Sequence, residues 1–298
     1  MTVHYRAFFS ESRFSGDQRR VHDFLIALNQ EEVREPGFLW GRWEWMFSHP
    51  MLDREHLGHI GIWEDDGDIV AVATYESGLG DAWFFVHPAY SRLKGDMIAH
   101  ALQKLSREGT LRLRIPDSDQ ALQELAARAG FVPTQDREET AILPIASTSL
   151  GYTLPEGYRI ATLAEDPELI RYNRVMWRGF NHEGEPPVTP DELAGRKQEV
   201  SGPHVQLDLK VAVQAPNGKF VSYCGMWYLP GTDYALVEPV ATDPDYRRMG
   251  LGRAAVLEGV RRCAALGAKF AYVGSSQTFY YRIGFRPSAT DTWWTLVR

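Results

Sequence analysis

The sequence predicts two copies of one mixed α/β domain. Its 298 residues exceed the usual length of a single domain, so two domains of about 150 residues are expected. Two short segments recur: residues 87–90 (HPAY) resemble residues 243–246 (DPDY), and residues 129–131 (AGF) resemble residues 283–285 (IGF). The offsets, 156 and 154 residues, are nearly equal and too long for a solenoid repeat, which indicates a duplicated domain.

The same order of elements is predicted in each half: an early helix, two paired strands, then strand, turn, helix, strand and helix. Residues 17–29 form the first helix, because Val21, Phe24, Leu25 and Leu28 recur on one face. The hairpins follow from apolar runs around tight turns. They comprise residues 60–63, 65–67 and 69–72 in the first half and residues 210–213, 216–218 and 220–223 in the second.

A small, polar stretch at residues 146–151, followed by Pro155, marks the boundary between the two copies. We therefore predict domains at residues 1–147 and 150–298. The composition, with 44% hydrophobic and 24% charged residues, is that of a soluble globular protein. No apolar leader follows Met1, and no membrane span is expected, so a cytoplasmic location is predicted.

Composition also restricts the ligands. The two cysteines, Cys224 and Cys263, support neither a disulfide framework nor a cysteine metal site, and His56 with His59 is too sparse a pair, so no metal is expected. The net charge of −7 leaves no basic footprint for nucleic acid. It weakly favours a cationic partner such as an amine.

The loop at residues 247–252 (RRMGLG) carries the clearest chemistry. It follows a predicted strand at residues 234–241 and opens a helix whose buried face includes Val256 and Val260. Glycines at a helix start leave backbone N–H groups free to hold phosphate oxygens, and nearby arginines add positive charge. The loop lacks the Walker lysine. It fits G-x-G-x-x-A, but the acid of a dinucleotide fold is missing, and a glycine-containing helix start with exposed arginines is the plain alternative.

The pattern Arg247-x-x-Gly250-x-Gly252 resembles the Q/R-x-x-G-x-G/A signature of the GNAT superfamily of acyl-CoA N-acyltransferases. Residues 240–248 resemble the strand and turn before that loop, and residues 279–285 (FYYRIGF) resemble the family's F-Y-x-x-x-G-F helix ending. The resemblance covers about residues 205–298, with weaker likeness elsewhere. It implies two tandem GNAT-like domains, each a mostly antiparallel sheet flanked by helices.

The resemblance implies acetyl-CoA as co-substrate. Gln277 or Ser276 stands where many relatives have asparagine. Tyr280 matches the tyrosine that can protonate the departing thiolate; Tyr281 is its rival, and a core role is the alternative. The implied cofactor contacts are Val240, Ala241, Thr242, Arg247, Arg248, Met249, Gly250, Leu251, Gly252, Arg253 and Gln277.

An attacking amine must lose a proton, and Glu238 lies on the strand beside the expected thioester position. Glu238 is the candidate base; a carboxylate that pairs with arginine or lies at a bulge beside Pro239 is the alternative. The loop at residues 180–187 is expected to form an acceptor wall or lid. The acceptor candidates are Trp177, Phe180, His182 and Glu183. The aromatic residues Phe38, Trp40, Trp43, Trp45 and Phe47 favour core packing over a pocket or dimer face.

In the first half, the 156-residue offset aligns residues 250–252 with Lys94, Gly95 and Asp96. A carboxylate near phosphate and a side chain in place of glycine both oppose binding. The first domain is therefore predicted to be degenerate and non-catalytic.

Two functions remain open from the sequence. The first is acetyl transfer from acetyl-CoA to a primary amine, by direct attack and without a covalent acyl-enzyme. A small-molecule acceptor is favoured, and the amine of a protein N-terminus or lysine is the alternative. The second is a non-catalytic CoA-binding sensor or interaction protein. No nucleic acid or membrane partner is expected, and a homodimer is left open.

Overall fold

The computed structural model describes residues 2–296; residues 1, 297 and 298 of the two predicted domains lie outside it. The chain forms two compact units. Unit 1 comprises Met1–Phe47, Met51–Thr140 and Ser288–Arg298, and unit 2 comprises Ser48–Pro50 and Ala141–Pro287. These units differ from the predicted domains at their edges, since residues 141–147 group with unit 2 and the C-terminal strand groups with unit 1. Within residues 2–296, no helix has the length and apolar character needed to cross a bilayer.

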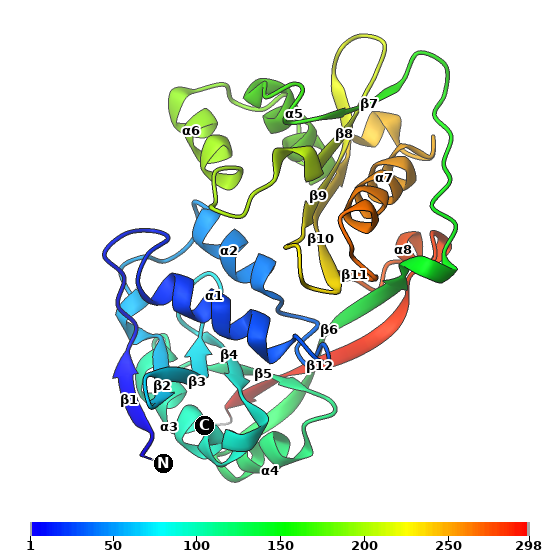
Figure 1. Ribbon diagram of the computed structural model, residues 1–298. Helices are drawn as coiled ribbons and strands as arrows, with labels where there is room; N and C mark the ends of the chain where they lie inside the picture. The colour runs from blue at the N-terminus through cyan, green and yellow to red at the C-terminus, as the bar shows by residue number, and fades with distance from the viewer. Residues whose placement is uncertain (1, 297–298) are drawn as a thin grey trace. The chain divides into compact units, whose positions relative to one another are not determined.

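Unit 1 is a mixed sheet with helices against it (Figure 1). Its first three pairings, from β1 to β4, are antiparallel, β4 and β5 are parallel, and β5 and β12 are antiparallel. The strands are β1 (His4–Ala7), β2 (Gly61–Asp65), β3 (Asp68–Thr74), β4 (Asp81–Val86), β5 (Arg112–Pro116) and β12 (Arg286–Leu296). The helices are α1 (Asp17–Leu28), α2 (Trp40–Ser48), α3 (Lys94–His100) and α4 (Gln120–Arg128).

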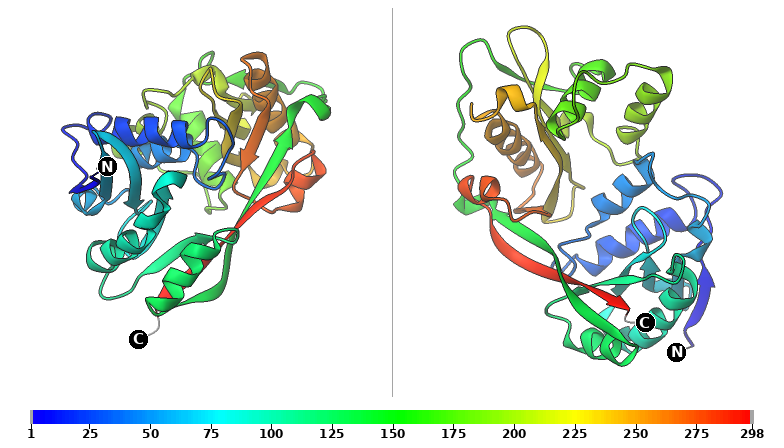
Figure 2. Two further views of the ribbon diagram at one scale, coloured as in Figure 1. Left: turned by 60° about the horizontal axis from the view of Figure 1, so that its bottom comes forward. Right: turned by 180° about the vertical axis from the view of Figure 1, so that it is seen from behind.

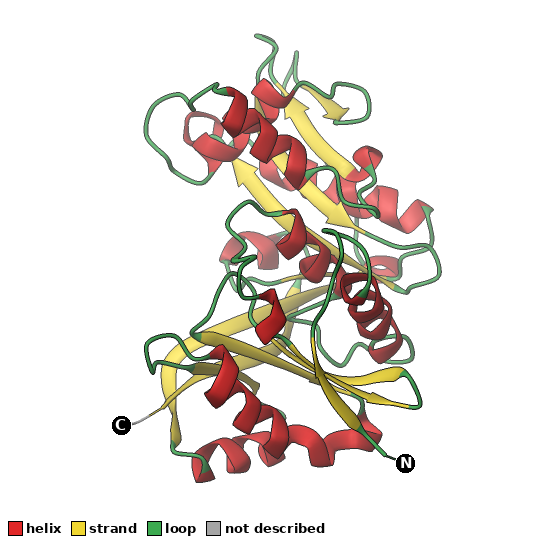
Figure 3. Ribbon diagram, turned by 90° about the vertical axis from the view of Figure 1, so that its left-hand side faces the viewer, coloured by secondary structure: helices red, strands yellow, loops and turns green. Residues whose placement is uncertain are grey.

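Unit 2 repeats that order of pairings. Three antiparallel pairings connect β7 to β10, β10 and β11 are parallel, and β11 pairs antiparallel with residues 141–144 of β6. The strands are β7 (Arg159–Thr162), β8 (Lys210–Gln214), β9 (Phe220–Trp227), β10 (Tyr234–Thr242), β11 (Phe270–Val273) and the end of β6 (Phe131–Pro144), whose residues 131–140 belong to unit 1. The helices are α5 (Leu169–Gly179), α6 (Pro190–Glu199), α7 (Leu251–Ala265) and α8 (Thr278–Arg282). Figure 3 shows helices beside the strands of both units.

The identical pairing order in the two units supports the duplication. The repeated Gly-Phe pairs occupy matching places: Gly130 (φ +92°) and Gly284 (φ +114°) are both left-handed, and each precedes the strand that closes a sheet. The closing strands are exchanged, because β12, from the end of the chain, pairs with β5 of unit 1, whereas the end of β6 pairs with β11 of unit 2. Figure 2 shows β12 beside β6, its neighbour in the strand order.

The cores follow the predicted apolar faces. Val256 and Val260 of α7 are fully buried in the core of unit 2. In unit 1 the aromatic cluster packs in the interior, which confirms core packing over a pocket or dimer face. Its buried members are Phe38, Trp40, Trp43 and Phe47, and Trp45 is half-buried.

Candidate active site

Strands β10 and β11 of unit 2 separate beyond Leu236, on the side of the predicted phosphate-binding loop. The parallel pairing of β10 with β11 covers only residues 234–236, and the pairing of β10 with β9 shifts register between Val237 and Val240. No strand among the described residues therefore pairs with the β11-facing edge of β10 beyond Leu236. Gly225 permits the shift, since a Cβ there would lie 2.5 Å from the carbonyl oxygen of Glu238.

The loop between β10 and α7 opens the helix without a side-chain cap. Gly250, the N-cap residue, is left-handed (φ +80°), a conformation that favours glycine. The N–H groups of residues 248–253 have no backbone acceptor within residues 2–296. Unpaired N–H groups at the positive end of a helix dipole form a site for an anion.

A cavity of about 740 Å³ adjoins this helix start, a volume within the range of ligand sites. Its lining includes most of the predicted cofactor residues, together with Phe180 and Tyr280. Those lining residues are Val240, Thr242, Arg247, Arg248, Gly250, Leu251, Gly252, Arg253 and Gln277. The lining also includes six residues that were not among the predicted cofactor or acceptor contacts: Gly179, Asn181, Tyr246, Phe279, Arg282 and Ile283.

The lining is cationic and contains no carboxylate. Arg248, Arg253 and Arg282 make no ion pair within the described part of the chain, so their charges remain available to a ligand. Arg247 has a different role: its guanidinium donates to the carbonyl oxygen of Gly179 (3.0 Å) and to Oδ1 of Asn181 (2.7 Å). Arg247 thus fastens the loop to the end of α5. The combination of free N–H groups and unpaired arginines fits a polyphosphate.

A buried ion cluster holds the turn before this loop. Asp243 is fully buried and accepts a hydrogen bond from the N–H of Asp245. Its carboxylate lies 2.7 Å from Nη1 of Arg174 and 3.5 Å from Nε of Arg178, and Arg178 also pairs with Asp245 at 3.0 Å. This cluster was not predicted from the sequence. Arg174 and Arg178, four residues apart on α5, are the one sequence feature that could have indicated the cluster, because residues at this spacing share a helix face.

Tyr280 is 7% exposed, lines the cavity and packs against Phe279 and Phe285, with ring centroids 4.9 and 5.6 Å away. Burial raises the pKa of its phenol, and the neighbouring Cys224 and Glu238 raise it further. The hydroxyl therefore stays protonated at neutral pH. Glu238 is half-buried on β10, and its charge contributes to the raised pKa of Tyr280. Glu238 is not part of the cavity lining.

The acceptor candidates do not all meet at the cavity. Phe180 lines it and is 52% exposed. Trp177 instead stacks on His182, with ring centroids 4.4 Å apart, and its Nε1 donates to the carbonyl oxygen of Glu183 at 3.1 Å. These three residues form a local turn after α5, outside the lining.

Two predicted cofactor contacts also lie outside the lining. Ala241 is 3% exposed and packs against Gly179: a Cβ added to Gly179 would lie 2.5 Å from the Cβ of Ala241. Met249 is exposed at the surface of the loop. Neither side chain reaches the cavity.

The corresponding segment of unit 1 has a different local geometry. Leu93 and Lys94 are both right-handed helical, and Nζ of Lys94 lies 2.6 Å from a carboxylate oxygen of Asp119. The left-handed glycine of the unit 2 loop therefore has no counterpart at Lys94, and the lysine charge is already paired. That the first domain is non-catalytic stays a prediction.

Comparison with known proteins identifies a family for part of the chain. Residues 177–285 match the acetyltransferase (GNAT) family. These residues lie in unit 2, so the match identifies a GNAT-family domain there, and the fold of the whole chain is similar to that of a tandem GNAT protein. No curated protein matches its sequence.

Three solved structures illustrate the similarity of fold. One is a tandem GNAT protein from the clavulanic acid biosynthesis pathway, solved without AcCoA (TM-score 0.66, 13% identity, covering 99% of this chain and 98% of that one). The second is a GCN5-related N-acetyltransferase from Sphaerobacter thermophilus (TM-score 0.60, 16% identity, 98% and 95%). The third is a GNAT-family acetyltransferase from Colwellia psychrerythraea (TM-score 0.60, 11% identity, 99% and 100%). At these identities the likeness concerns the fold.

Proposed function

We propose that this protein transfers an acetyl group from acetyl-CoA to a primary amine of a small molecule. The observation that carries the proposal is the unit 2 cavity, where a glycine-opened helix start with unpaired arginines lies beside a buried, protonated tyrosine. Anion binding and proton donation are two of the tasks that this chemistry requires. Both would be performed within one cavity.

In the proposed mechanism, the N–H groups of residues 248–253 and the arginines Arg248, Arg253 and Arg282 bind the pyrophosphate of the co-substrate. The unpaired edge of β10 beyond Leu236 binds the extended pantetheine arm by backbone hydrogen bonds. This arrangement aligns the thioester beside the amine, which lowers the entropic part of the barrier.

Two side chains handle the protons. Glu238 accepts a proton from the amine, whose nitrogen forms the new bond to the acetyl carbon. Tyr280 donates its phenolic proton to the sulfur as the carbon–sulfur bond breaks. The products are then the amide and the free thiol, and protons are balanced when Glu238 releases its proton to solvent and Tyr280 takes one from solvent.

The cysteines support direct transfer rather than a covalent acyl-enzyme. Cys224 and Cys263 are both fully buried, and burial raises the pKa of each thiol, that of Cys263 to about 12. A thiol acts as a nucleophile only as its thiolate. Neither cysteine therefore offers an acyl-accepting group at neutral pH.

The test measures acetyl-CoA binding by the wild type, Gly252→Asp and the control Gly252→Ala. A Cβ at Gly252 would meet Oγ1 of Thr242 at 3.1 Å and the ring of Phe279 at 3.3 Å, so the alanine variant reports the steric part alone. A carboxylate about 5 Å from a phosphate costs about 3 kcal/mol, or about a hundredfold in affinity.

We expect acetyl-CoA at about a hundred times its dissociation constant to stabilise the wild type by roughly 3 kcal/mol. The aspartate variant should lose this stabilisation, and the alanine variant should keep most of it. A wild type that acetyl-CoA does not stabilise would refute the proposal. Binding without thiol release across a panel of primary amines would favour the CoA-binding sensor instead.

A further inference from the structure

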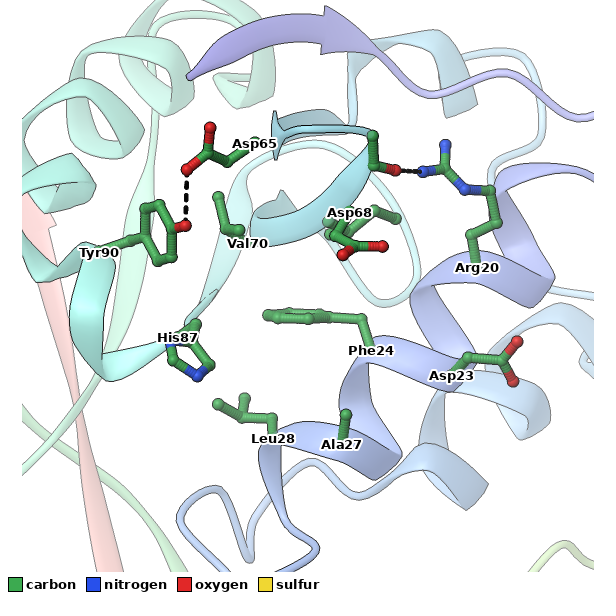
Figure 4. Close-up of a pocket in the computed structure, with 12 residues that line it drawn as sticks. Arg20, Asp23, Phe24, Ala27, Leu28, Asp65, Asp68, Val70, His87 and Tyr90 are labelled. Carbon is green, nitrogen blue, oxygen red and sulfur yellow. Dashed lines mark hydrogen bonds between the residues drawn. The ribbon is translucent and has the colours of Figure 1, made fainter. Parts of the chain in front are cut away.

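Unit 1 contains a cavity of its own, of about 590 Å³, away from its degenerate loop. Residues from α1, from the turn between β2 and β3, and from the segment after β4 surround it (Figure 4). Lys94, Gly95 and Asp96 are not among its lining residues. The cavity is therefore not a remnant of the anion cradle and needs its own explanation.

A comparison of the two units explains why this space is open. His87 and Asp243 occupy equivalent positions, since each follows the fourth strand of its unit and precedes a proline. Each side chain also caps a 3-10 helix by accepting a hydrogen bond from the backbone N–H of the residue two positions later. Around Asp243, two arginines of α5 fill the gap with buried ion pairs. Around His87, α1 instead presents Phe24 and Leu28, and the gap remains a cavity.

The charge of the lining is negative. It contains Asp23, Asp65 and Asp68 against a single arginine, Arg20. The guanidinium of Arg20 is already engaged, since Nη2 donates to the carbonyl oxygen of Gly67 (2.6 Å) and Nη1 pairs with Glu64 (2.5 Å). The three aspartates therefore lack a compensating cation from the lining.

Two of these carboxylates have unused hydrogen-bonding capacity. Asp65 is 6% exposed; one of its oxygens accepts from the hydroxyl of Tyr90 at 2.7 Å, and the other, Oδ1, is buried without a hydrogen-bond partner in residues 2–296. Asp68 is exposed and makes no ion pair or hydrogen bond with its side chain in the same range. The exposed carboxylate of Asp68 is thus open to a cationic donor in the cavity, with which it can form a charge-assisted hydrogen bond.

The floor of the cavity is apolar. Phe24, Leu28, Ile69 and Val70 line it, and each is less than a tenth exposed. In Figure 4 the ring of Phe24 extends from α1 toward the space between Val70 and His87. An aromatic ring beside carboxylates favours an organic cation, because the ring face attracts positive charge and the floor buries hydrocarbon.

We propose that this cavity of unit 1 is a separate binding site for a small organic ammonium ion with an apolar body. Asp68 binds the ammonium group, Asp23 and Asp65 add negative charge to the lining, and the floor formed by Phe24, Leu28, Ile69 and Val70 takes the hydrocarbon or aromatic part. The site has the opposite charge to the arginine-lined cavity of unit 2, so the two cavities select ligands of opposite sign. It is independent of acetyl transfer.

The test follows methyl groups by NMR in the full chain labelled at Ile, Leu and Val, with 2-phenylethylammonium as the probe. The matched ligand control is 3-phenylpropionate, which has a similar body and a negative charge. Resonances of Leu28, Ile69 and Val70 should shift saturably with the ammonium, with a dissociation constant of about 1 mM for a ligand of this size, and not with the carboxylate.

Asp68→Asn should weaken binding about fivefold, which is the usual upper limit of the contribution that a solvent-accessible ion pair makes to affinity. Asp66→Asn is the matched control, because Asp66 lies in the same turn, is exposed and lies outside the lining. Equal binding of the carboxylate, equal affinity in Asp68→Asn and wild type, or no saturable shift would each overturn the proposal. Shifts confined to Val240, Leu251 and Ile283 would locate the probe in unit 2 and would overturn it as well.

Discussion

Replacing Tyr280 with phenylalanine removes one oxygen from the unit 2 cavity and little else. The ring keeps its contacts with Phe279 and Phe285, and the hydroxyl has no hydrogen-bond partner among residues 2–296 that its loss would strand. We therefore expect a change of less than about 1 kcal/mol in the free energy of unfolding. Acetyl-CoA affinity should stay within about twofold, because the tyrosine is proposed to act only on the departing sulfur.

The rate of acetyl transfer should fall much further. A positioned general acid contributes about 100-fold or more, which corresponds to about 3 kcal/mol of activation free energy. The assay is thiol release from acetyl-CoA, with the amine that gives the fastest release in a panel of primary amines. Thermal unfolding and acetyl-CoA binding are measured on the same samples.

Tyr281→Phe is the matched control, because Tyr281 is the adjacent phenol, is half-buried and does not line the cavity. Its kcat should remain near that of the wild type. An unchanged kcat in Tyr280→Phe would show that this phenol is not the acid. A loss in Tyr281→Phe alone would transfer the role to its neighbour.

Two further predictions concern buried charges in unit 2. Asp243→Asn should lower the free energy of unfolding in urea by about 3 kcal/mol, because it leaves Arg174 and Arg178 without the charge of their buried partner. Asp245→Asn, at an exposed position, should lower it by less than about 1 kcal/mol. Equal losses in the two variants would show that burial does not strengthen the ion pairs of Asp243. Burial acts to raise the pKa of Glu258, but hydrogen bonds from Arg261, Arg262 and Tyr152 outweigh burial and hold the pKa below its usual 4.5. The ionised Glu258 therefore stabilises the fold above pH 4.5, and this stabilisation is lost as the pH falls. Glu258→Gln should therefore lower Tm at about pH 7 and show a smaller further loss between about pH 5 and pH 2; parallel pH profiles for the two proteins would refute this.

Local patterns predicted the elements that are complete within a short stretch of chain. The apolar spacing of α1, the two hairpins and the glycine loop before α7 all depend on residues a few positions apart. The loop chemistry was equally local, since a left-handed Gly250 and the N–H groups after it belong to consecutive residues. These features needed no information about distant partners.

The site was predicted less completely, because part of it comes from elsewhere in the chain. Arg247 lines the cavity, but its hydrogen bonds to Gly179 and Asn181, more than sixty residues earlier, were not predicted. Trp177 and His182 were expected near the acceptor, yet they stack on each other outside the cavity. A side chain's direction depends on the partners that folding brings to it, and the local pattern does not contain them.

The duplication, the copy that has the open glycine loop and most of the order of elements in each copy could be predicted from the amino-acid sequence. The strands β1 and β7 and the helices α2 and α6 were not predicted. Which strand closes which sheet could not be predicted, since β6 and β12 both follow a Gly-Phe pair and only long-range pairing with β11 or β5 distinguishes them. Nor could the sequence show that a pair of arginines fills the gap beside Asp243, whereas the gap beside His87 is a cavity. The reason is physical: strand partners and cavities are set by packing between distant segments, whereas periodicity reports only neighbours along the chain.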